Sequence, residues 1–183
     1  MMSKVIDFGL DPNNIVCFDT ETTGLDGSAE ICQLAIVNFD ETVVFSKLIK
    51  PQEKISKEVS LIHGVTNEMV AYEKDIKYWW SFLNKQFFTS KLVLGYNVMY
   101  DIRMLFQSIT RFEKNIYFSP FMVIDVMTLV SNLSADGKWM SLGSACKKYE
   151  IEEPDNLKYH NAEFDAIMTM RLFKKISQAQ IDF

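Results

Sequence analysis

The sequence is poor in histidine and cysteine, with two and three among its 183 residues. It contains no closely spaced His or Cys pairs of the kind that hold zinc. The cysteines, Cys17, Cys32 and Cys146, are odd in number and widely spaced, so we expect reduced residues of the core. Free buried cysteines are typical of cytoplasmic proteins.

Long apolar runs are also missing. No stretch of about 18 apolar residues could span a bilayer, and the first residues lack the continuous apolar segment of a signal peptide. There is no internal repeat, low-complexity segment or linker, while 48% of the residues are hydrophobic. We therefore expect a soluble, cytoplasmic protein without membrane contact, in which residues 1–183 form one domain with a sizeable core.

An excess of basic residues is absent as well. The 19 Lys and Arg stand against 24 Asp and Glu, which gives a formal charge of −5. A protein that holds nucleic acid only through contacts to phosphates is expected to be basic. The charge balance taken alone argues against that class of binder.

Two carboxylates lie one residue apart at the end of an apolar segment, in the run Val16–Leu25. Side chains alternate along a strand, so Asp19 and Glu21 share one face. Two buried acids side by side repel each other and lose their hydration, which makes sense mainly if divalent cations neutralise them. The run therefore predicts half of a metal site.

Two later segments offer further ligands. After the strand-like run Leu92–Leu94, a helical pattern carries Asp101 on its first turn. Near the end of the chain, His160 and Asp165 are separated by about 140° around a continuous helix, so they could not easily face the same point if both were helical. We expect His160 in the loop before the last helix and Asp165 on the first turns of that helix.

Four carboxylates without a His or Cys pair favour hard cations such as Mg²⁺ or Mn²⁺. Two such ions about 3.5–4 Å apart can make a water nucleophilic and stabilise a leaving oxyanion, as phosphodiester hydrolysis requires. Setting the four acids aside leaves 20 acids against 19 bases, and two bound ions would add positive charge. Bound metal ions, rather than a basic protein surface, could then attract the phosphate group of a phosphodiester substrate.

The ordered set Asp19-x-Glu21, Asp101 and His160-x4-Asp165 resembles the DEDDh branch of the DnaQ-like 3′-to-5′ exonucleases. That family includes the proofreading epsilon subunit of bacterial replicative DNA polymerase. The three motifs in this order and spacing are specific, because each falls at the secondary-structure junction that the chemistry requires.

The resemblance covers the core of the chain, from about Ile15 to about Ile176. Two further runs match the family, Leu61–Thr66 and Asp125–Leu129. One departure is Tyr96, where many relatives carry His before the Asn. This departure bears on substrate contacts and leaves the metal set untouched.

The resemblance also implies a role for each residue of the site. Asp19 would bridge two divalent ions, Mg²⁺ or Mn²⁺, and Glu21 and Asp165 would complete the inner set of ligands. Asp101 would act partly through water. His160 would be the general base on the attacking water, a role that suits an imidazole near neutral pH.

Apolar patterning predicts three strands followed by alternating helices and strands, and the short connection Asp40-Glu41 makes the second and third strands a hairpin. This order implies an α/β protein with a mixed five-stranded sheet flanked by helices, which the resemblance identifies as the ribonuclease H-like fold. The expected strands are 15–19, 30–39, 42–49, 91–95 and 121–124. The expected helices are 57–62, 72–88, 101–112, one from the fifth strand to about 133, one capped by Ser141 and ending near 149, and 162–177.

The turn that follows Glu21 is a candidate for substrate contact. Thr22 and Gly24 are expected to offer a hydroxyl and backbone N–H groups to the terminal 3′-OH, with Leu25 against the last base. A simple turn from strand to loop is the alternative.

Three more residues lie beside the expected site. For Tyr96 and Asn97, a substrate contact and a structural role stay open. For His63, packing of its loop and a contact to a nucleotide also stay open.

Aromatic and basic residues elsewhere can be explained by core packing or by exposure to solvent. Trp79, Trp80 and Phe87 lie at helical spacing, so we expect core packing rather than base stacking. Four lysines could approach the phosphates of an incoming strand, and a solvated helix face explains them equally well. These lysines are Lys138, Lys147, Lys148 and Lys158.

We therefore expect a metal-dependent exonuclease that hydrolyses DNA from the 3′ end of single-stranded or frayed termini, in proofreading or repair. Two alternatives stay open because the catalytic set does not encode sugar or base selectivity. One is an exonuclease that trims RNA 3′ ends, and the other is a catalytically idle nucleic-acid-binding module.

The C-terminal tail, residues 178–183, suggests a partner. Gln178, Ile181 and Phe183 resemble the short peptide by which bacterial replication proteins dock in the apolar pocket of the polymerase sliding clamp. The alternative is an ordinary frayed tail whose apolar residues fold back on the domain.

Overall fold

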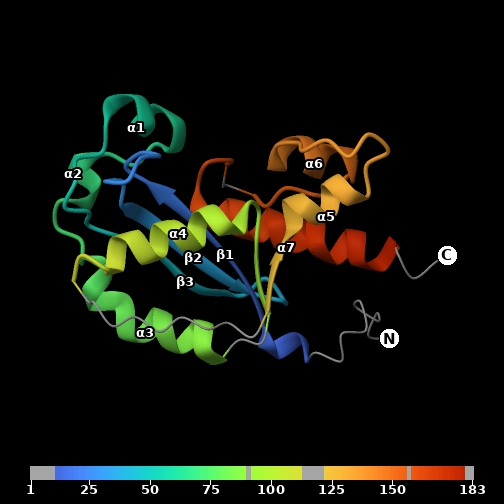
Figure 1. Cartoon of the computed structure of the whole chain (residues 1–183), viewed down its shortest axis with the longest axis horizontal. Helices are drawn as coiled ribbons and strands as arrows, with labels where there is room; N and C mark the ends of the chain where they lie inside the picture. The colour runs from blue at the N-terminus through green and yellow to red at the C-terminus, as the bar shows by residue number, and fades with distance from the viewer. Residues whose placement is uncertain (1–10, 90–91, 113–121, 156–157, 180–183) are drawn as a thin grey trace.

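The described residues form a five-stranded sheet with helices on both faces (Figure 1). The computed structural model describes residues 11–89, 92–112, 122–155 and 158–179. The strands are β1 (Ile15–Thr22), β2 (Ile31–Asn38), β3 (Val43–Leu48), β4 (Leu92–Gly95) and β5 (Met122–Asp125). Their order is β3-β2-β1-β4-β5, with β1–β2 and β2–β3 antiparallel and the other pairs parallel. The mixed five-stranded sheet is confirmed.

Helices cover both faces of the sheet. The helices α3 (Ile76–Thr89) and α4 (Val98–Ile109) pack on one face, and α7 (Ala162–Ala179) packs on the other. The shorter helices are α1 (Lys57–His63), α2 (Asn67–Val70), α5 (Val126–Asn132) and α6 (Leu142–Lys148). Both α5 and α6 pack beside α7, while α1 and α2 lie near the end of the sheet where β1 finishes (Figure 1).

The central strand β1 is buried on both faces. Cys17 points into the core that α7 covers, and Phe18 points into the core that α3 and α4 cover. This alternation is the geometry of a pleated strand. The side chain of Phe87 is fully buried in the second core, and Trp79 and Trp80 pack against it, so the predicted core role of these aromatics is confirmed.

The start of α4 was predicted wrongly. The helix begins at Val98 rather than at Asp101, because Asn97 adopts a left-handed conformation (φ 59°) that ends the preceding strand segment. The N–H of Asn97 donates a hydrogen bond of 2.9 Å to Oδ1 of Asp125. Asp101 still lies on the first turn of the helix.

The start of α3 was also predicted wrongly, since this helix begins at Ile76 rather than at Tyr72. The side chain of Tyr72 is 98% exposed. Oδ1 of Asp75 accepts a hydrogen bond of 2.9 Å from the N–H of Tyr78, as a residue that caps a helix does.

Other boundaries shift by a few residues. The strand β1 continues past Asp19 to Thr22, because β2 pairs with it as far as Thr22. The helix α2 was not predicted, and α4 ends at Ile109, before the predicted 112. Residues 91 and 121, with which two predicted strands begin, lie outside the described residues. Ser141 caps α6 as predicted, since its Oγ accepts a hydrogen bond of 3.2 Å from the N–H of Ser144.

Cys17, Cys32 and Cys146 are buried and free, as predicted. Within the described ranges, no helix is both long enough and apolar enough to cross a membrane. The backbone of Gln178 belongs to the last turn of α7, whereas Ile181 and Phe183 lie outside the described residues.

Candidate metal centre and active site

Asp19 and Glu21 project from β1 toward the face that α7 covers. They alternate with Cys17 on that face, and Cys17 belongs to the core packed against α7. Asp165 lies on the first turn of α7. One carboxylate oxygen from each of the three acids lies within 4.8 Å of the other two. Strand alternation and helix packing thus bring together three of the acids that the sequence singled out.

Asp101 reaches the same region from α4. It is 3% exposed, and its Oδ1 accepts hydrogen bonds from the backbone N–H (3.0 Å) and the hydroxyl (2.6 Å) of Thr20. Thr20 stands between Asp19 and Glu21 in β1. These two bonds therefore hold the first turn of α4 against the segment that carries both acids.

The four carboxylates are hard to ionise together. Burial, followed by the charges of Asp101, Asp165 and Glu21, raises the pKa of Asp19 well above its ordinary value. Burial and the neighbouring charges raise the pKa of Glu21 to about 8. Burial raises the pKa of Asp101 to about 7 and that of Asp165 to about 6, while hydrogen bonds to each oppose the shift. A bound cation would relieve both the desolvation and the repulsion.

The residues present fit a divalent metal ion. Oδ2 of Asp165 accepts a hydrogen bond of 3.0 Å from the N–H of His160, but its buried Oδ1 has no hydrogen-bond partner within the described part of the chain. Buried polar atoms in folded proteins are nearly always satisfied, so a carboxylate that has a free oxygen and lies beside two other acids is suited to coordinate a cation. An all-oxygen set suits Mg²⁺ or Mn²⁺ better than zinc.

His160 lies in the loop immediately before α7, as predicted. It adopts a left-handed conformation (φ 62°), and its side chain is exposed. The next residue, Asn161, caps α7, since its Oδ1 accepts hydrogen bonds from the N–H groups of Glu163 (3.1 Å) and Phe164 (3.4 Å). The left-handed turn and the hydrogen bond from its N–H place the backbone of His160 beside Asp165, and its side chain has access to solvent.

His63 has both ring nitrogens engaged within the protein. Nδ1 accepts a hydrogen bond of 3.0 Å from the N–H of Val65, so the ring proton belongs to Nε2, which lies 3.1 Å from the carbonyl oxygen of Thr22. Burial and the nearby charge of His160 lower the pKa of His63, which keeps the ring neutral. This arrangement ties α1 to the end of β1 and favours the loop-packing interpretation.

The turn after β1 is held by a tyrosine that the sequence interpretation missed. The hydroxyl of Tyr100 lies 2.7 Å from Oγ1 of Thr22 and 3.0 Å from the carbonyl oxygen of Gly24, and Oγ1 of Thr22 also donates to that carbonyl (2.8 Å). The side chain of Leu25 is 77% exposed. The available signal was the position of Tyr100, directly before Asp101 at the start of α4.

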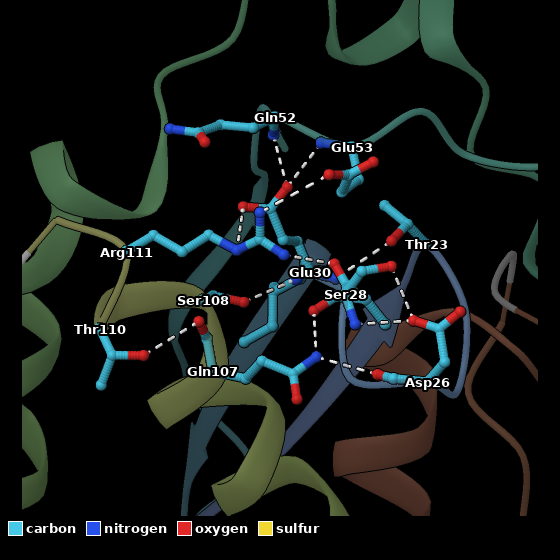
Figure 2. Close-up of polar contacts among 12 residues, drawn as sticks. Thr23, Asp26, Ser28, Glu30, Gln52, Glu53, Gln107, Ser108, Thr110 and Arg111 are labelled. Atoms are coloured by element: carbon cyan, nitrogen blue, oxygen red, sulfur yellow. Dashed lines mark hydrogen bonds and ion pairs between the residues drawn. The ribbon is translucent and has the colours of Figure 1, made fainter.

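A second group of polar contacts, around Glu30, holds the rest of the loop between β1 and β2 (Figure 2). The buried carboxylate of Glu30 accepts hydrogen bonds of 2.6 Å from the N–H groups of both Gln52 and Glu53. Arg111 contacts the other oxygen of Glu30 at 3.2 Å and donates to the carbonyl of Ser28. Gln107 donates to two more carbonyls of this loop, those of Asp26 and Ala29. Nothing in the local sequence of Glu30 signalled this role.

Tyr96 and Asn97 differ in their contacts. The hydroxyl of Tyr96 donates a hydrogen bond of 2.7 Å to the carbonyl oxygen of Met140, in the segment between α5 and α6. Asn97 is exposed and precedes α4. Tyr96 therefore joins two segments at the site, and a substrate contact by either residue stays a prediction.

A known family matches most of the chain. The family described as "RNase_T: Exonuclease" matches residues 16–173. An uncharacterized exonuclease, CP81, of Escherichia phage 186 is 36% identical over 93 residues, which are 51% of this chain and 47% of that protein. The DNA polymerase III subunit epsilon of Buchnera aphidicola is 28% identical over 182 residues, which are 91% of this chain and 75% of that protein. The chain thus spans about half the length of the phage relative.

Solved structures share the fold. Exonuclease X in complex with 5′-overhanging duplex DNA superposes with a TM-score of 0.71 and 26% identity, covering 90% of this chain and 92% of that one. The Mg²⁺- and Mn²⁺-bound form of S. pombe Pop2p superposes with a TM-score of 0.72 and 13% identity, covering 92% of this chain and 84% of that one. The second likeness concerns the fold alone.

Proposed function

Because the chain belongs to the RNase T/DnaQ-like exonuclease family, we propose that it is a metal-dependent 3′-to-5′ exonuclease of the DEDDh type that acts on DNA. The observation that carries this proposal is the cluster of Asp19, Glu21 and Asp165, in which one Asp165 oxygen has no hydrogen-bond partner among the described residues and the exposed His160 lies next to the same carboxylate. An acidic cluster of this kind is costly without a cation, so a protein that only binds nucleic acid has no reason to keep it.

Each residue has a role in this proposal. Asp19, Glu21 and Asp165 hold the metals, and Asp101, whose Oδ1 is engaged by Thr20, contributes mainly through water and charge. When bound, two Mg²⁺ or Mn²⁺ ions would supply a nucleophilic water and neutralise the leaving oxyanion. His160 accepts the proton of the attacking water, because its ring is solvent-accessible and its backbone is fixed to Asp165.

The turn after β1 receives the terminal nucleotide. Its backbone is fixed by Tyr100, and the exposed side chain of Leu25 is free to pack on the last base. Splaying the last bases of a duplex costs less when they are mispaired or already single-stranded. We therefore propose that frayed or single-stranded 3′ ends are the preferred substrates.

The comparisons support DNA as the substrate in this proposal. The structure of exonuclease X is a complex with DNA, and the Buchnera relative is a DNA polymerase subunit. A proofreading or repair role follows from that preference. The alternative of RNA trimming rests on the absence of any sugar-selective feature in the acid cluster.

One experiment separates these functions. The protein is incubated with Mg²⁺ or Mn²⁺ and with 5′-labelled single-stranded DNA, RNA of the same sequence, DNA duplexes with a paired or a mismatched 3′ end, and circular single-stranded DNA. We expect a ladder of shortened 5′-labelled DNA products, faster removal of a 3′ mismatch than of a paired end, and an intact circle. Faster loss of RNA would support the trimming function, and binding without cleavage would support an idle module. A cut circle would contradict the exonuclease.

The sliding clamp is a further proposed partner, through Gln178, Ile181 and Phe183. A single short peptide buries little area, so its affinity should be weak and useful only when tethering raises the effective concentration. Fluorescence polarisation of the labelled chain with the clamp of its host tests this hypothesis. Absence of binding at high micromolar concentration, or binding unchanged by deletion of Phe183, would remove it.

A further inference from the structure

Trp139 is an exposed tryptophan in the segment between α5 and α6. Its side chain is 72% exposed, whereas Trp79 and Trp80 pack against the core under α3 and α4. Tryptophan is highly buried on average in folded proteins, and it is enriched at binding interfaces, where its ring supplies a large contact area.

Two contacts connect the region around Trp139 to segments that lead into the acid-bearing helices. The carbonyl of Met140 accepts the 2.7 Å hydrogen bond from Tyr96, which lies just before the helix that carries Asp101. In α6, which follows Met140 and Ser141, a Cβ placed on Gly143 would lie 3.5 Å from the ring of Tyr159, the residue before His160. The partly buried Met140 packs into the core beside α7, while the neighbouring indole of Trp139 stays in solvent.

The charge of the region formed by this segment and α6 differs from that of the whole protein. Residues 133–149 contain three lysines, Lys138, Lys147 and Lys148, and one acid, Asp136, in a chain of net charge −5. The ammonium of Lys138 lies 3.4 Å from Asp136, with the two side chains 79% and 57% exposed. Such an exposed pair is weak, so Lys138 can turn to a phosphate at little cost.

We propose that Trp139 and Lys138 form a binding site for an unpaired nucleotide of the substrate strand, upstream of the terminal nucleotide. The indole stacks on the base, and the ammonium contacts the adjacent phosphate. An exposed aromatic beside a basic side chain is how proteins hold single strands without reading sequence. The contacts with Tyr96 and Tyr159, which directly precede the segments that carry Asp101 and His160, argue for the substrate strand as the occupant. The inference rests on the proposed function.

Kinetics distinguish this site from a structural role. Trp139→Ala is compared with wild type on single-stranded DNA of about 12 nucleotides and on a dinucleotide, which is too short to reach the site. The loss of stacking should raise KM for the long substrate by roughly 5- to 100-fold, with kcat changed by less than about twofold. Trp139→Phe should restore most of the affinity. Equal effects on both substrates, or none on the long one, would overturn the proposal.

The matched control is Tyr78→Ala. Tyr78 is 62% exposed and lies on α3, the helix on the opposite face of the sheet from α7. Its removal should leave KM for both substrates unchanged. An increase equal to that of Trp139→Ala would point to a general loss of stability, and would contradict a specific site.

Intrinsic fluorescence tests binding without cleavage. In the Asp19→Asn full chain, titration with oligothymidylate should quench tryptophan emission, and the added Trp139→Phe change should remove most of that quenching, since the other two tryptophans pack in the core. Quenching that persists after Trp139 is replaced would contradict the proposal. A different result is quenching that depends on Trp139 together with no cleavage by the wild-type protein. That result would refute the proposed hydrolysis but would support the nucleotide site.

Discussion

The guanidinium of Arg111 contacts the buried carboxylate of Glu30 at 3.2 Å, across the start of β2 (Figure 2). Arg111 follows α4, the helix that carries Tyr100 and Asp101 on its first turn. The two ends of this helix therefore make different attachments. Its first turn is attached to the strand that carries Asp19 and Glu21, and the residues near its end hold the loop between β1 and β2. The position of Leu25 relative to the acids depends on both attachments.

Glu30→Gln should lower the free energy of unfolding by about 1–3 kcal/mol and raise KM for single-stranded DNA. The uncharged amide has only one oxygen, so it cannot both accept the two hydrogen bonds from N–H groups and form an ion pair with Arg111. Urea unfolding and initial rates measure the two effects. The control is Glu53→Gln: Glu53 lies 3.7 Å from Arg111 with its side chain 51% exposed, and its loss should cost less than about 0.5 kcal/mol. Equal losses in the two variants would contradict a special role for Glu30.

Tyr100→Phe should raise KM several-fold and leave the metal affinity unchanged. The variant keeps the ring but removes the hydroxyl that lies 2.7 Å from Oγ1 of Thr22 and 3.0 Å from the carbonyl of Gly24. The turn then becomes looser, while no carboxylate is altered. Steady-state kinetics and calorimetric titration with Mn²⁺ check this pair of results. A wild-type KM would show that the turn does not depend on Tyr100.

Without divalent metal, the stability of the protein should fall as pH rises from about 5 to about 8. The pKa values are raised to about 8 for Glu21, about 7 for Asp101 and about 6 for Asp165. The folded state therefore holds protons that the unfolded chain has already released. The stability from these groups is fully present below about pH 4 and is lost as pH rises through the folded-state values. Thermal unfolding in a chelator measures this slope, and saturating Mg²⁺ should flatten it.

Asp19→Asn should abolish cleavage, with a loss of at least about a hundredfold, and should raise the melting temperature of the metal-free protein near pH 8. One buried negative charge disappears from a group of four, so repulsion falls while the shape is kept. Oligonucleotide cleavage and thermal melts in a chelator measure the two results. Retention of more than about a tenth of the activity would contradict the assignment of Asp19 as a metal ligand.

His160→Gln should lower kcat by roughly a hundredfold or more, with the metal affinity preserved. The backbone N–H that holds Asp165 is unchanged in this variant, so only the proton acceptor is lost. The other histidine of the chain, His63, provides the comparison: His63→Gln should lower the melting temperature and affect kcat less, because its ring packs between Val65 and Thr22. A larger fall in kcat for His63→Gln than for His160→Gln would reverse the two assignments.

Strand and helix periodicity predicted where Asp19, Glu21 and His160 lie, while the family resemblance supplied the complete acid set. Asp19 and Glu21 share a face because side chains in a strand alternate, and His160 had to leave the helix of Asp165 because five residues turn a helix too far. The structure bears out both placements. Where the sequence interpretation failed, as at the starts of α3 and α4, a capping side chain or a left-handed residue decided the boundary.

By itself, the sequence determined the class of the sheet and the face that Asp19 and Glu21 share, because these follow from repeats of two and about 3.6 residues along the chain. Only the tertiary structure decided which residues hold the substrate turn. Glu30 and Arg111 are separated in the chain by every element from β2 to α4, and Tyr100 meets Gly24 only because α4 packs across the end of β1. Contacts of this kind depend on how helices lie on the sheet, which no local pattern specifies.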